Sequence, residues 1–262
     1  MSSPTFVLAT IHPAPPGSVT PHLPRARTCI YRGMWAELPP NKHNNAPKND
    51  RIYESDLPTF TTDARMQKVS DLFTTGPGKA KHEEQMVGCG GGGPVEAVFW
   101  VDEVKVQWRI RGTAWVVARD VEAEVGEHGE TSGVRTLKAE IGERMRIVDQ
   151  EKVPEWSWAK ELTAHFGNCS PGMRGSWRNP PPGTPVKGEP DEDHKLGQQV
   201  DDLEDPVARE NFRVVIIKPD LVESVDLTDP KKSRRHLYTF VVEDDAEKGV
   251  KKGDWKEEIL WP

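Results

Sequence analysis

The chain has 262 residues, a net charge of −7 and a sequence pI near 5.7, which allow one large domain or two small ones. The acidic balance disfavours a general nucleic-acid-binding protein, and no apolar run approaches the roughly 18 residues of a membrane span. Valine is twice as common as leucine, and glycine and proline number 22 and 23, so the composition favours strands and turns over helices. No signal peptide is visible, and we expect a cytoplasmic protein.

Cysteine and histidine spacing gives no support to a metal site or a disulfide framework. Cys29, Cys89 and Cys169 lie far apart, and no pair has CxxC spacing. The eight histidines are scattered, and none forms an HxxxH or HExxH pattern. We therefore expect reduced thiols and no metal ion.

The first 75 residues predict three strands and one helix. Residues 6–11 and 27–34 form an antiparallel pair joined by a proline-rich loop, and residues 57–61 form a third, short strand. A helix begins near residues 62–65, where threonine or aspartate can cap it. Its apolar stripe consists of Met66, Val69, Leu72 and Phe73.

A glycine run at residues 88–93 interrupts the chain before the strongest strand signal. A phosphate-binding P-loop needs a lysine and a serine or threonine directly after its glycines, whereas Pro94 and Val95 follow here. We therefore expect a flexible surface insertion near residues 74–94.

The remainder of the chain predicts a mainly β protein with few helices. Expected strands cover residues 95–102, 104–112, 113–120, 212–218, 221–227, 236–243 and 255–260, and an expected helix covers residues 156–166. The segment 121–144 reads as a loop or insertion, and residues 187–205 carry a net charge of −6 and read as a loosely held acidic loop. These meanders predict one domain over residues 1–262, folded as an antiparallel, Greek-key-like barrel with three insertions.

A few polar residues at predicted strand ends are candidates for function. Thr62, Arg65 and Lys68 lie where a strand passes into a helix, and backbone N–H groups there favour an anion. Gln107 is polar among apolar neighbours in the middle of a strand. Taken singly, an arginine or lysine is more often an exposed surface charge than a ligand-binding group.

The order of five short motifs resembles one known family, the pyridoxamine 5'-phosphate oxidase-like, FMN-binding split-barrel proteins. The motifs are RTCIYR (27–32), FTTDARMQK (60–68), QWRIRG (107–112), CSPGMRGSWRNPPPG (169–183), and RHLYTF (235–240) together with WKEEILWP (255–262). Each motif alone is weakly specific, but all five occur in the family's order across the chain. The resemblance implies a homodimer whose flavin sites form at the dimer interface.

The resemblance also assigns roles to residues of this chain. Its cofactor-binding residues are Arg27 and Lys68 at the phosphate or ribityl tail, Thr62 and Arg65 beside them, Arg32 near the flavin and substrate, Gln107 at the polar edge of the ring, and Arg235, contributed by the partner subunit. Arg174 and Ser176 lie in the region that resembles the family's substrate-phosphate loop. Arginine and lysine are the residues best suited to hold the FMN phosphate.

The substrate region departs from the family pattern. Lys231 and Ser233 stand where the vitamin-converting enzymes have an arginine and a histidine, and Val225 replaces a tryptophan at the flavin edge. We therefore expect an FMN-dependent oxidoreductase with an altered site for a small-molecule substrate. Two alternatives stay open: a flavin-binding protein or sensor without turnover, and a β-barrel interaction module without flavin.

Overall fold

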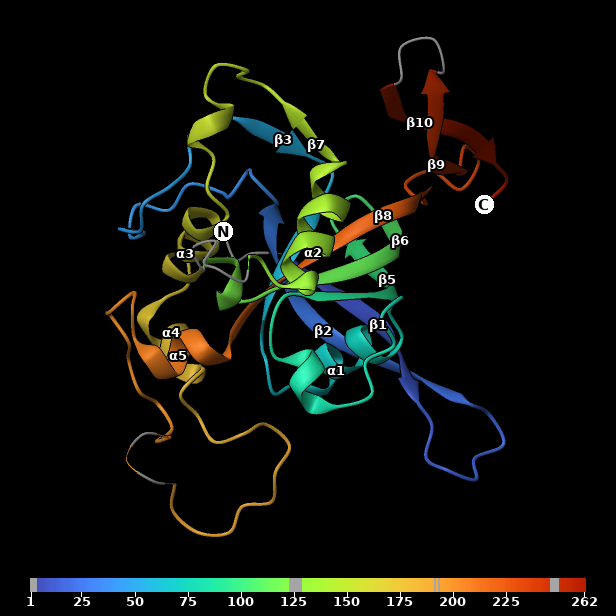
Figure 1. Ribbon diagram of the computed structural model, residues 1–262. Helices are drawn as coiled ribbons and strands as arrows, with labels where there is room; N and C mark the ends of the chain where they lie inside the picture. The colour runs from blue at the N-terminus through green and yellow to red at the C-terminus, as the bar shows by residue number, and fades with distance from the viewer. Residues whose placement is uncertain (1–3, 123–128, 191, 193, 246–249) are drawn as a thin grey trace.

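One eight-stranded antiparallel sheet that bends into a barrel organises the protein (Figure 1). A computed structural model describes residues 4–122, 129–190, 192, 194–245 and 250–262. The strands of this sheet are β1 (Thr5–Pro13), β2 (His22–Met34), β4 (Pro58–Asp63), β5 (Gly90–Val101), β6 (Val106–Val117), β8 (Phe212–Asp226), β9 (Arg234–Asp245) and β10 (Val250–Leu260). A separate pair consists of β3 (Tyr53–Ser55) and β7 (Met145–Ile147).

Short helices cover one side of the barrel and one of its ends. They are α1 (Gln67–Thr74), α2 (Ser132–Gly142), α3 (Trp158–Gly167), α4 (Pro171–Ser176) and α5 (Pro206–Asn211), with single 3₁₀ turns η1 (Glu83–Met86), η2 (Arg119–Glu122) and η3 (Val153–Glu155). None of the helices in the described ranges has the length and apolar character that a membrane span requires.

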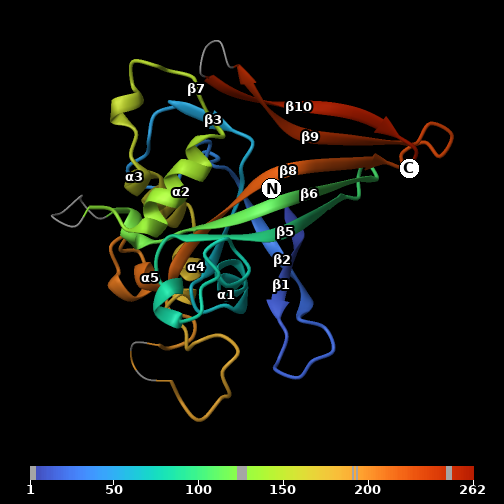
Figure 2. The same ribbon diagram turned by 45° about the vertical axis from the view of Figure 1, so that its right-hand side comes forward.

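The long strand β8 both closes the barrel and leaves it. Its first half pairs with β4, and β6 pairs with it along most of its length, which completes the ring β8–β4–β2–β1–β5–β6. From Leu221 onward β8 pairs with β9 instead of β4, so the β9–β10 hairpin extends away from the barrel (Figure 2). This is the mainly β split-barrel architecture that the sequence predicts.

Two hydrophobic clusters lie on the two faces of the barrel wall. Inside the barrel, Phe6, Leu8 and Phe60 pack with Leu72 of α1. Outside it, β6 and β8 pack against α2, α3 and α4 through a second cluster that includes Trp115, Leu137, Phe166, Trp177 and Phe212. Each of these strands is therefore buried on both faces, which explains why residues 114–117 and 214–217 are apolar without alternation.

The other half of the sheet has one uncovered apolar face. β1 buries Phe6 and Leu8 but exposes Val7 and Ile11, because successive side chains of a strand point to opposite faces. Ile30 on β2 and Trp100 on β5 are exposed on the same side, as the strand register requires. We call the surface formed by Val7, Ile11, Ile30 and Trp100 the open face.

The glycine run belongs to β5, which corrects the expectation of a flexible insertion. Gly90, Gly91 and Gly92 have positive φ angles, and β5 bulges against β6 between Gly91 and Gly93. A Cβ atom on Gly92 would lie 2.8 Å from the ring of Trp115. Glycine is required here because β5 passes close to the Trp115 indole in a conformation that other residues rarely adopt.

Three further expectations need correction. Residues 95–120 form two long strands rather than three, and residues 212–226 form one strand rather than two, because glycine or proline is accommodated in a bulge near Gly112 and Pro219. The segment 121–144 contains α2, whose N-terminus is capped by Thr131. The acidic segment is a loop as expected, since its described residues contain no helix or strand, and its end is held where Val200 is buried and Asp205 caps α5.

Candidate functional site

The junction of β4 and α1 buries a lysine beside a threonine. The Nζ of Lys68 donates a hydrogen bond to the Oγ1 of Thr62 at 3.0 Å, and both residues are buried. Burial lowers the pKa of Lys68, and the positive charge of nearby Arg27 lowers this pKa further. Within the described chain no second acceptor takes a hydrogen bond from this ammonium group, which has three donors. An anionic ligand would supply the missing acceptors.

A pocket of about 750 Å³ opens at this junction. Three residues of the predicted site line it, namely Thr62, Lys68 and Ser176. Trp177 and the proline-rich segment 180–190 complete much of its wall. Its volume lies within the range of small-molecule and cofactor sites.

Asn179 is a pocket residue that sequence reasoning missed. It lines the same cavity as Lys68, and its Oδ1 atom is buried without a hydrogen-bond partner. A buried acceptor of this kind is costly unless something donates to it. The available sequence signal was its position directly before three consecutive prolines.

Arg27 lies near Lys68 but is engaged by the protein itself. Its guanidinium donates to the Oγ1 of Thr10 at 2.7 Å and pairs with the buried carboxylate of Asp71 at 3.4 Å. It also donates to the carbonyl of Leu8 at 3.3 Å. Asp71, which also accepts from Thr10, was not predicted, because Arg27 and Thr10 lie 44 and 61 residues away from it in sequence.

Arg65 and Arg32 both form side-chain hydrogen bonds with residues of β4. Arg65 forms a two-pronged ion pair with Asp63 at 2.6 and 2.9 Å and donates to the carbonyl of Trp177 at 3.3 Å. The Nε of Arg32 donates to the Oγ1 of Thr61 at 3.3 Å. Neither arginine lines the pocket, whereas Asp63 and Thr61 do.

The two expected substrate residues have different surroundings. Arg174 is buried, and its guanidinium donates to the carbonyls of Val200, Cys169 and Gly167 at 2.7, 3.1 and 3.3 Å. These bonds tie α4 to its neighbouring segments, and Arg174 is not among the residues that line the pocket. Ser176 lies at the pocket, where its hydroxyl donates to the carbonyl of Met173 at 2.6 Å.

Gln107 and Arg235 lie together at the far end of β8. Val225 is the register partner of Gln107 on one side and of Arg235 on the other, so the three side chains share one face of the sheet. The register partner of Thr62 on the same strand is Arg213. The two groups of predicted residues are therefore separated by twelve residues of β8, or about 40 Å of strand.

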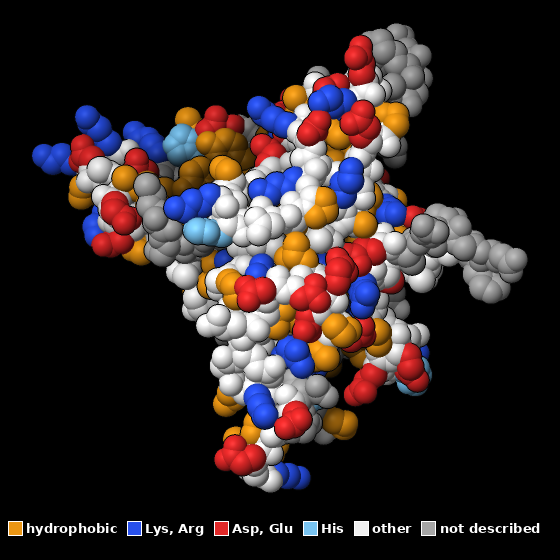
Figure 3. Space-filling model, turned by 90° about the vertical axis from the view of Figure 1, so that its left-hand side faces the viewer, with side chains coloured by type: hydrophobic (Ala, Val, Ile, Leu, Met, Phe, Trp, Pro, Cys, Tyr) orange, Lys and Arg blue, Asp and Glu red, His pale blue; other side chains and the backbone are white. Residues whose placement is uncertain are grey.

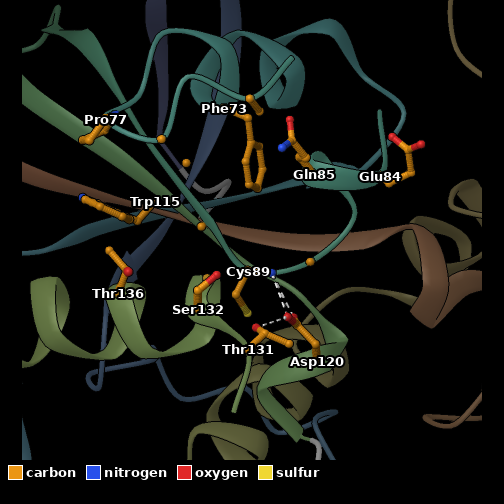
Figure 4. Close-up of a pocket in the computed structure, with 16 residues that line it drawn as sticks. Phe73, Pro77, Glu84, Gln85, Cys89, Trp115, Asp120, Thr131, Ser132 and Thr136 are labelled. Carbon is orange, nitrogen blue, oxygen red and sulfur yellow. Dashed lines mark hydrogen bonds between the residues drawn. The ribbon is translucent and has the colours of Figure 1, made fainter. Parts of the chain in front are cut away.

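A second pocket, of about 660 Å³, lies beside the glycine run (Figure 4). Phe73 and Trp115 lie on one side, and the first turn of α2 lies on the other. Asp120 accepts hydrogen bonds from the backbone N–H of Cys89 and from Thr131. Glu84 and Asp120 are its charged residues, and no lysine or arginine is among the described residues that line it, which disfavours a phosphate site here.

Side chains suited to a metal ion are not grouped in the described ranges, where no three histidine, cysteine, aspartate or glutamate residues converge. All three cysteines are buried and free.

Comparisons with known proteins agree with this fold. Residues 1–118 match the family model of the pyridoxamine 5'-phosphate oxidase FMN-binding domain. A pyridoxamine 5'-phosphate oxidase-related, FMN-binding protein from Nostoc punctiforme PCC 73102 has a similar structure, with a TM-score of 0.50 and 17% identity over 98% of this chain and 87% of that one. No curated protein matches the chain.

Two further solved structures are more distant. PhzG from Burkholderia lata 383, in complex with tetrahydrophenazine-1-carboxylic acid, has a TM-score of 0.38 and 14% identity over 98% of this chain and 82% of that one. General Stress Protein 26 from Bacillus anthracis has a TM-score of 0.31 and 11% identity over 85% and 84%. The fold and the family match together support the resemblance: the chain has the split-barrel fold, and its residues 1–118 match the family model of the pyridoxamine 5'-phosphate oxidase-like FMN-binding domains.

Proposed function

We propose that the protein binds FMN and is a flavin-dependent oxidoreductase that acts as a homodimer. The observation that carries the proposal is the buried ammonium of Lys68, which faces a pocket of cofactor size with one of its three donors used. The family match over residues 1–118 supports FMN as the ligand. When bound, the flavin would supply hydride and electron transfer, and the protein would position and tune it.

Lys68 and Thr62 are the residues that would hold the phosphate. A phosphate monoester carries close to two negative charges at neutral pH, so it restores the acceptors that the Lys68 ammonium lacks. Arg27 contributes its charge from nearby, while its donors stay with Thr10 and Asp71. Arg65 and Arg32 act through β4, because they hold Asp63 and Thr61 at the edge of the pocket.

The distance along β8 supports a homodimer with shared sites. Thr62, beside Lys68, and Gln107 pair with positions of β8 that are about 40 Å of strand apart, so we assign them to different flavins of the dimer. A second copy packed on the open face would bring its Gln107 and Arg235 to the flavin of the first. The exposed apolar side chains of Val7, Ile30 and Trp100 are the kind of surface that such an interface buries.

The substrate region supports a small-molecule substrate that differs from that of the vitamin-converting enzymes. Lys231 is exposed in the β8–β9 turn, and the Ser233 hydroxyl is used in a hydrogen bond to the carbonyl of Asp229. Ser176 and Asn179 are the pocket residues that we assign to this substrate region. The free cysteines support the expected cytoplasmic location.

The proposal is tested by flavin binding to the purified, flavin-stripped protein. After incubation with excess FMN and desalting, the protein should retain the flavin absorbance bands. Lys68→Met should weaken FMN binding at least tenfold and riboflavin binding much less, because riboflavin lacks the phosphate. Lys42→Met, which removes an exposed lysine, is the matched control and should bind both ligands normally. A colourless protein, or equal loss of both ligands in Lys68→Met, would contradict the assignment.

A second measurement tests whether the flavin-loaded protein oxidises the substrate of the vitamin-converting enzymes, and peroxide formation would exclude flavin binding without turnover. The FMN-loaded protein is mixed with pyridoxamine 5'-phosphate in air and assayed for hydrogen peroxide. The altered residues Lys231 and Ser233 lead us to expect little peroxide from this compound.

The β-barrel interaction module without flavin is the less supported alternative. A surface that binds an acidic partner needs clustered basic side chains, whereas basic and acidic side chains are intermixed on the face shown in Figure 3.

A further inference from the structure

A buried carboxylate lies between two arginines at the far end of β8. Glu223 is two residues before Val225, so its side chain shares the face of Gln107 and Arg235. Its Oε2 accepts a hydrogen bond from the Nη1 of Arg235 at 3.1 Å. Its Oε1 lies 3.2 Å from the Nε of Arg109, the register partner of Glu223 on β6.

The carboxylate of Glu223 is more deeply buried than the two arginines that contact it. The Glu223 side chain is 8% exposed, whereas the side chains of Arg235 and Arg109 are 31% and 42% exposed. The carboxylate is therefore buried beneath two guanidinium groups that solvent or a ligand can still reach. A buried carboxylate is tolerated only when it is paired, so this arrangement constrains both arginines.

Three polar atoms of the cluster lack hydrogen-bond partners. They are Arg109 Nε, Glu223 Oε1 and Arg235 Nε, and all three are buried. The Arg235 guanidinium has five donor hydrogens, and its hydrogen bond to Glu223 uses one of them. Arg109 Nε and Glu223 Oε1 face each other at 3.2 Å as an ion pair, whereas Arg235 Nε has no acceptor near it among the described residues. Unpaired buried donors are rare in proteins, and a bound group with acceptor atoms would satisfy the free donors of Arg235.

We propose that Glu223 is a positioning residue that holds the Arg235 guanidinium ready for the polar edge of the flavin ring. The proposal rests on the proposed function, which places Arg235 at the ring. An arginine already held by its neighbour loses less conformational freedom when it binds a ligand than a freely moving one. Glu223 thereby favours ring binding without touching the ring. Arg109 holds the second carboxylate oxygen and keeps Glu223 in place.

The test is a double-mutant cycle on riboflavin binding by the full-length, flavin-stripped protein. Riboflavin is the probe because it has the ring but no phosphate, so the Lys68 end of the site contributes little to the measurement. The variants are Glu223→Gln, Arg235→Gln and the double variant, with Glu96→Gln as the matched control. Glu96 is the other carboxylate near Arg109, at 3.5 Å, and its side chain is 40% exposed.

Glu223→Gln should weaken riboflavin binding about fivefold to tenfold in the wild-type background and not at all in the Arg235→Gln background. Glu96→Gln should leave the affinity unchanged. An equal loss in both backgrounds would mean that Glu223 acts only on stability and would overturn the proposal. Should Glu223→Gln fail to fold by circular dichroism, Glu223→Asp enters the same cycle, because it keeps the charge but is too short to keep both contacts.

The outcomes distinguish this inference from the proposed function. A wild-type protein that binds neither FMN nor riboflavin would overturn both. A wild-type protein that binds FMN, together with variants that show no coupling between Glu223 and Arg235, would overturn the positioning role alone.

Discussion

The Nζ of Lys68 lies 3.0 Å from the Oγ1 of Thr62, across the turn that joins β4 to α1. Thr62 ends a strand of the barrel wall, and Lys68 lies on the first turn of the helix that closes the barrel. Because the core of the barrel fixes both elements, the pair is held in place before any ligand arrives. This preorganisation is what an anion site needs, and it leads to the first of four predictions.

The affinity for FMN should fall at alkaline pH, whereas that for riboflavin should not. Burial lowers the pKa of Lys68 in the free protein, so its ammonium loses the proton at a lower pH than an exposed lysine does. A bound phosphate favours the charged form and raises that pKa, so binding takes up a proton in this pH range. Fluorescence titrations from neutral pH to about pH 10 measure the effect. Lys68→Met should abolish the slope, and a slope that persists in this variant would assign it to another group.

Replacing His165 should reduce the loss of stability in acid. Burial, with a smaller effect from the charge of Arg32, lowers the pKa of His165 to about 3. Below the unfolded-state pKa of about 6.5, the unfolded chain binds a proton that the folded chain does not, so stability falls as pH falls. Burial raises the pKa of neighbouring Glu161, which acts in the opposite direction.

We compare the free energy of unfolding of His165→Phe with that of the wild type. The difference should shift in favour of the variant by about 2 kcal/mol between pH 7 and pH 5, since each pH unit below 6.5 contributes about 1.4 kcal/mol. Phenylalanine keeps the ring stacked on Trp35. Urea denaturation at the two pH values measures the difference. Glu161→Gln is the companion variant, and a gain that does not change with pH would show that His165 does not titrate as described.

Alanine at the two glycines of α2 should have opposite effects. A Cβ on Gly133 would lie 2.2 Å from the carbonyl oxygen of Cys89, so Gly133→Ala forces α2 away from β5 and should cost about 1–3 kcal/mol. A Cβ on Gly142 meets nothing within 4 Å, and Gly142→Ala should stabilise the helix by up to about 1 kcal/mol. Thermal unfolding of both variants gives the comparison. Similar effects of the two substitutions would mean that α2 does not pack on the glycine run.

A charge on the open face should dissociate the proposed dimer. Ile30→Lys places an ammonium among exposed apolar side chains of β1, β2 and β5, where an interface would have to bury it. We expect a monomer by light scattering and at least tenfold weaker FMN binding, because each site then lacks the partner's Gln107 and Arg235. Val19→Lys, in the fully exposed β1–β2 loop, is the control. A dimer that survives Ile30→Lys would move the interface elsewhere.

Local patterns predicted the elements that border the site. The apolar stripe of Val69, Leu72 and Phe73 predicted α1, and all three residues are buried in the structure. Strand propensity predicted β1, β2 and β4, and Thr62 and Lys68 lie close together because α1 follows β4 directly in the chain. The glycine run misled the prediction, because glycine in a flexible loop and glycine under a tryptophan ring look the same in sequence.

The sequence by itself determined the mainly β class, the helix at residue 67 and the charged residues on either side of it, because propensity and periodicity act over a few neighbouring residues. Only the tertiary structure decided which of those charged side chains keep hydrogen-bond donors that a ligand can use. Arg27 is held by Asp71, and Arg174 by three carbonyls, through contacts that depend on how the strands and helices pack. Lys68 is a buried cation at the pocket, and packing leaves two of its three donors without an acceptor among the described residues. The net charge of −7 could not show this, because burial and hydrogen bonding, not composition, determine what a charged group can still bind.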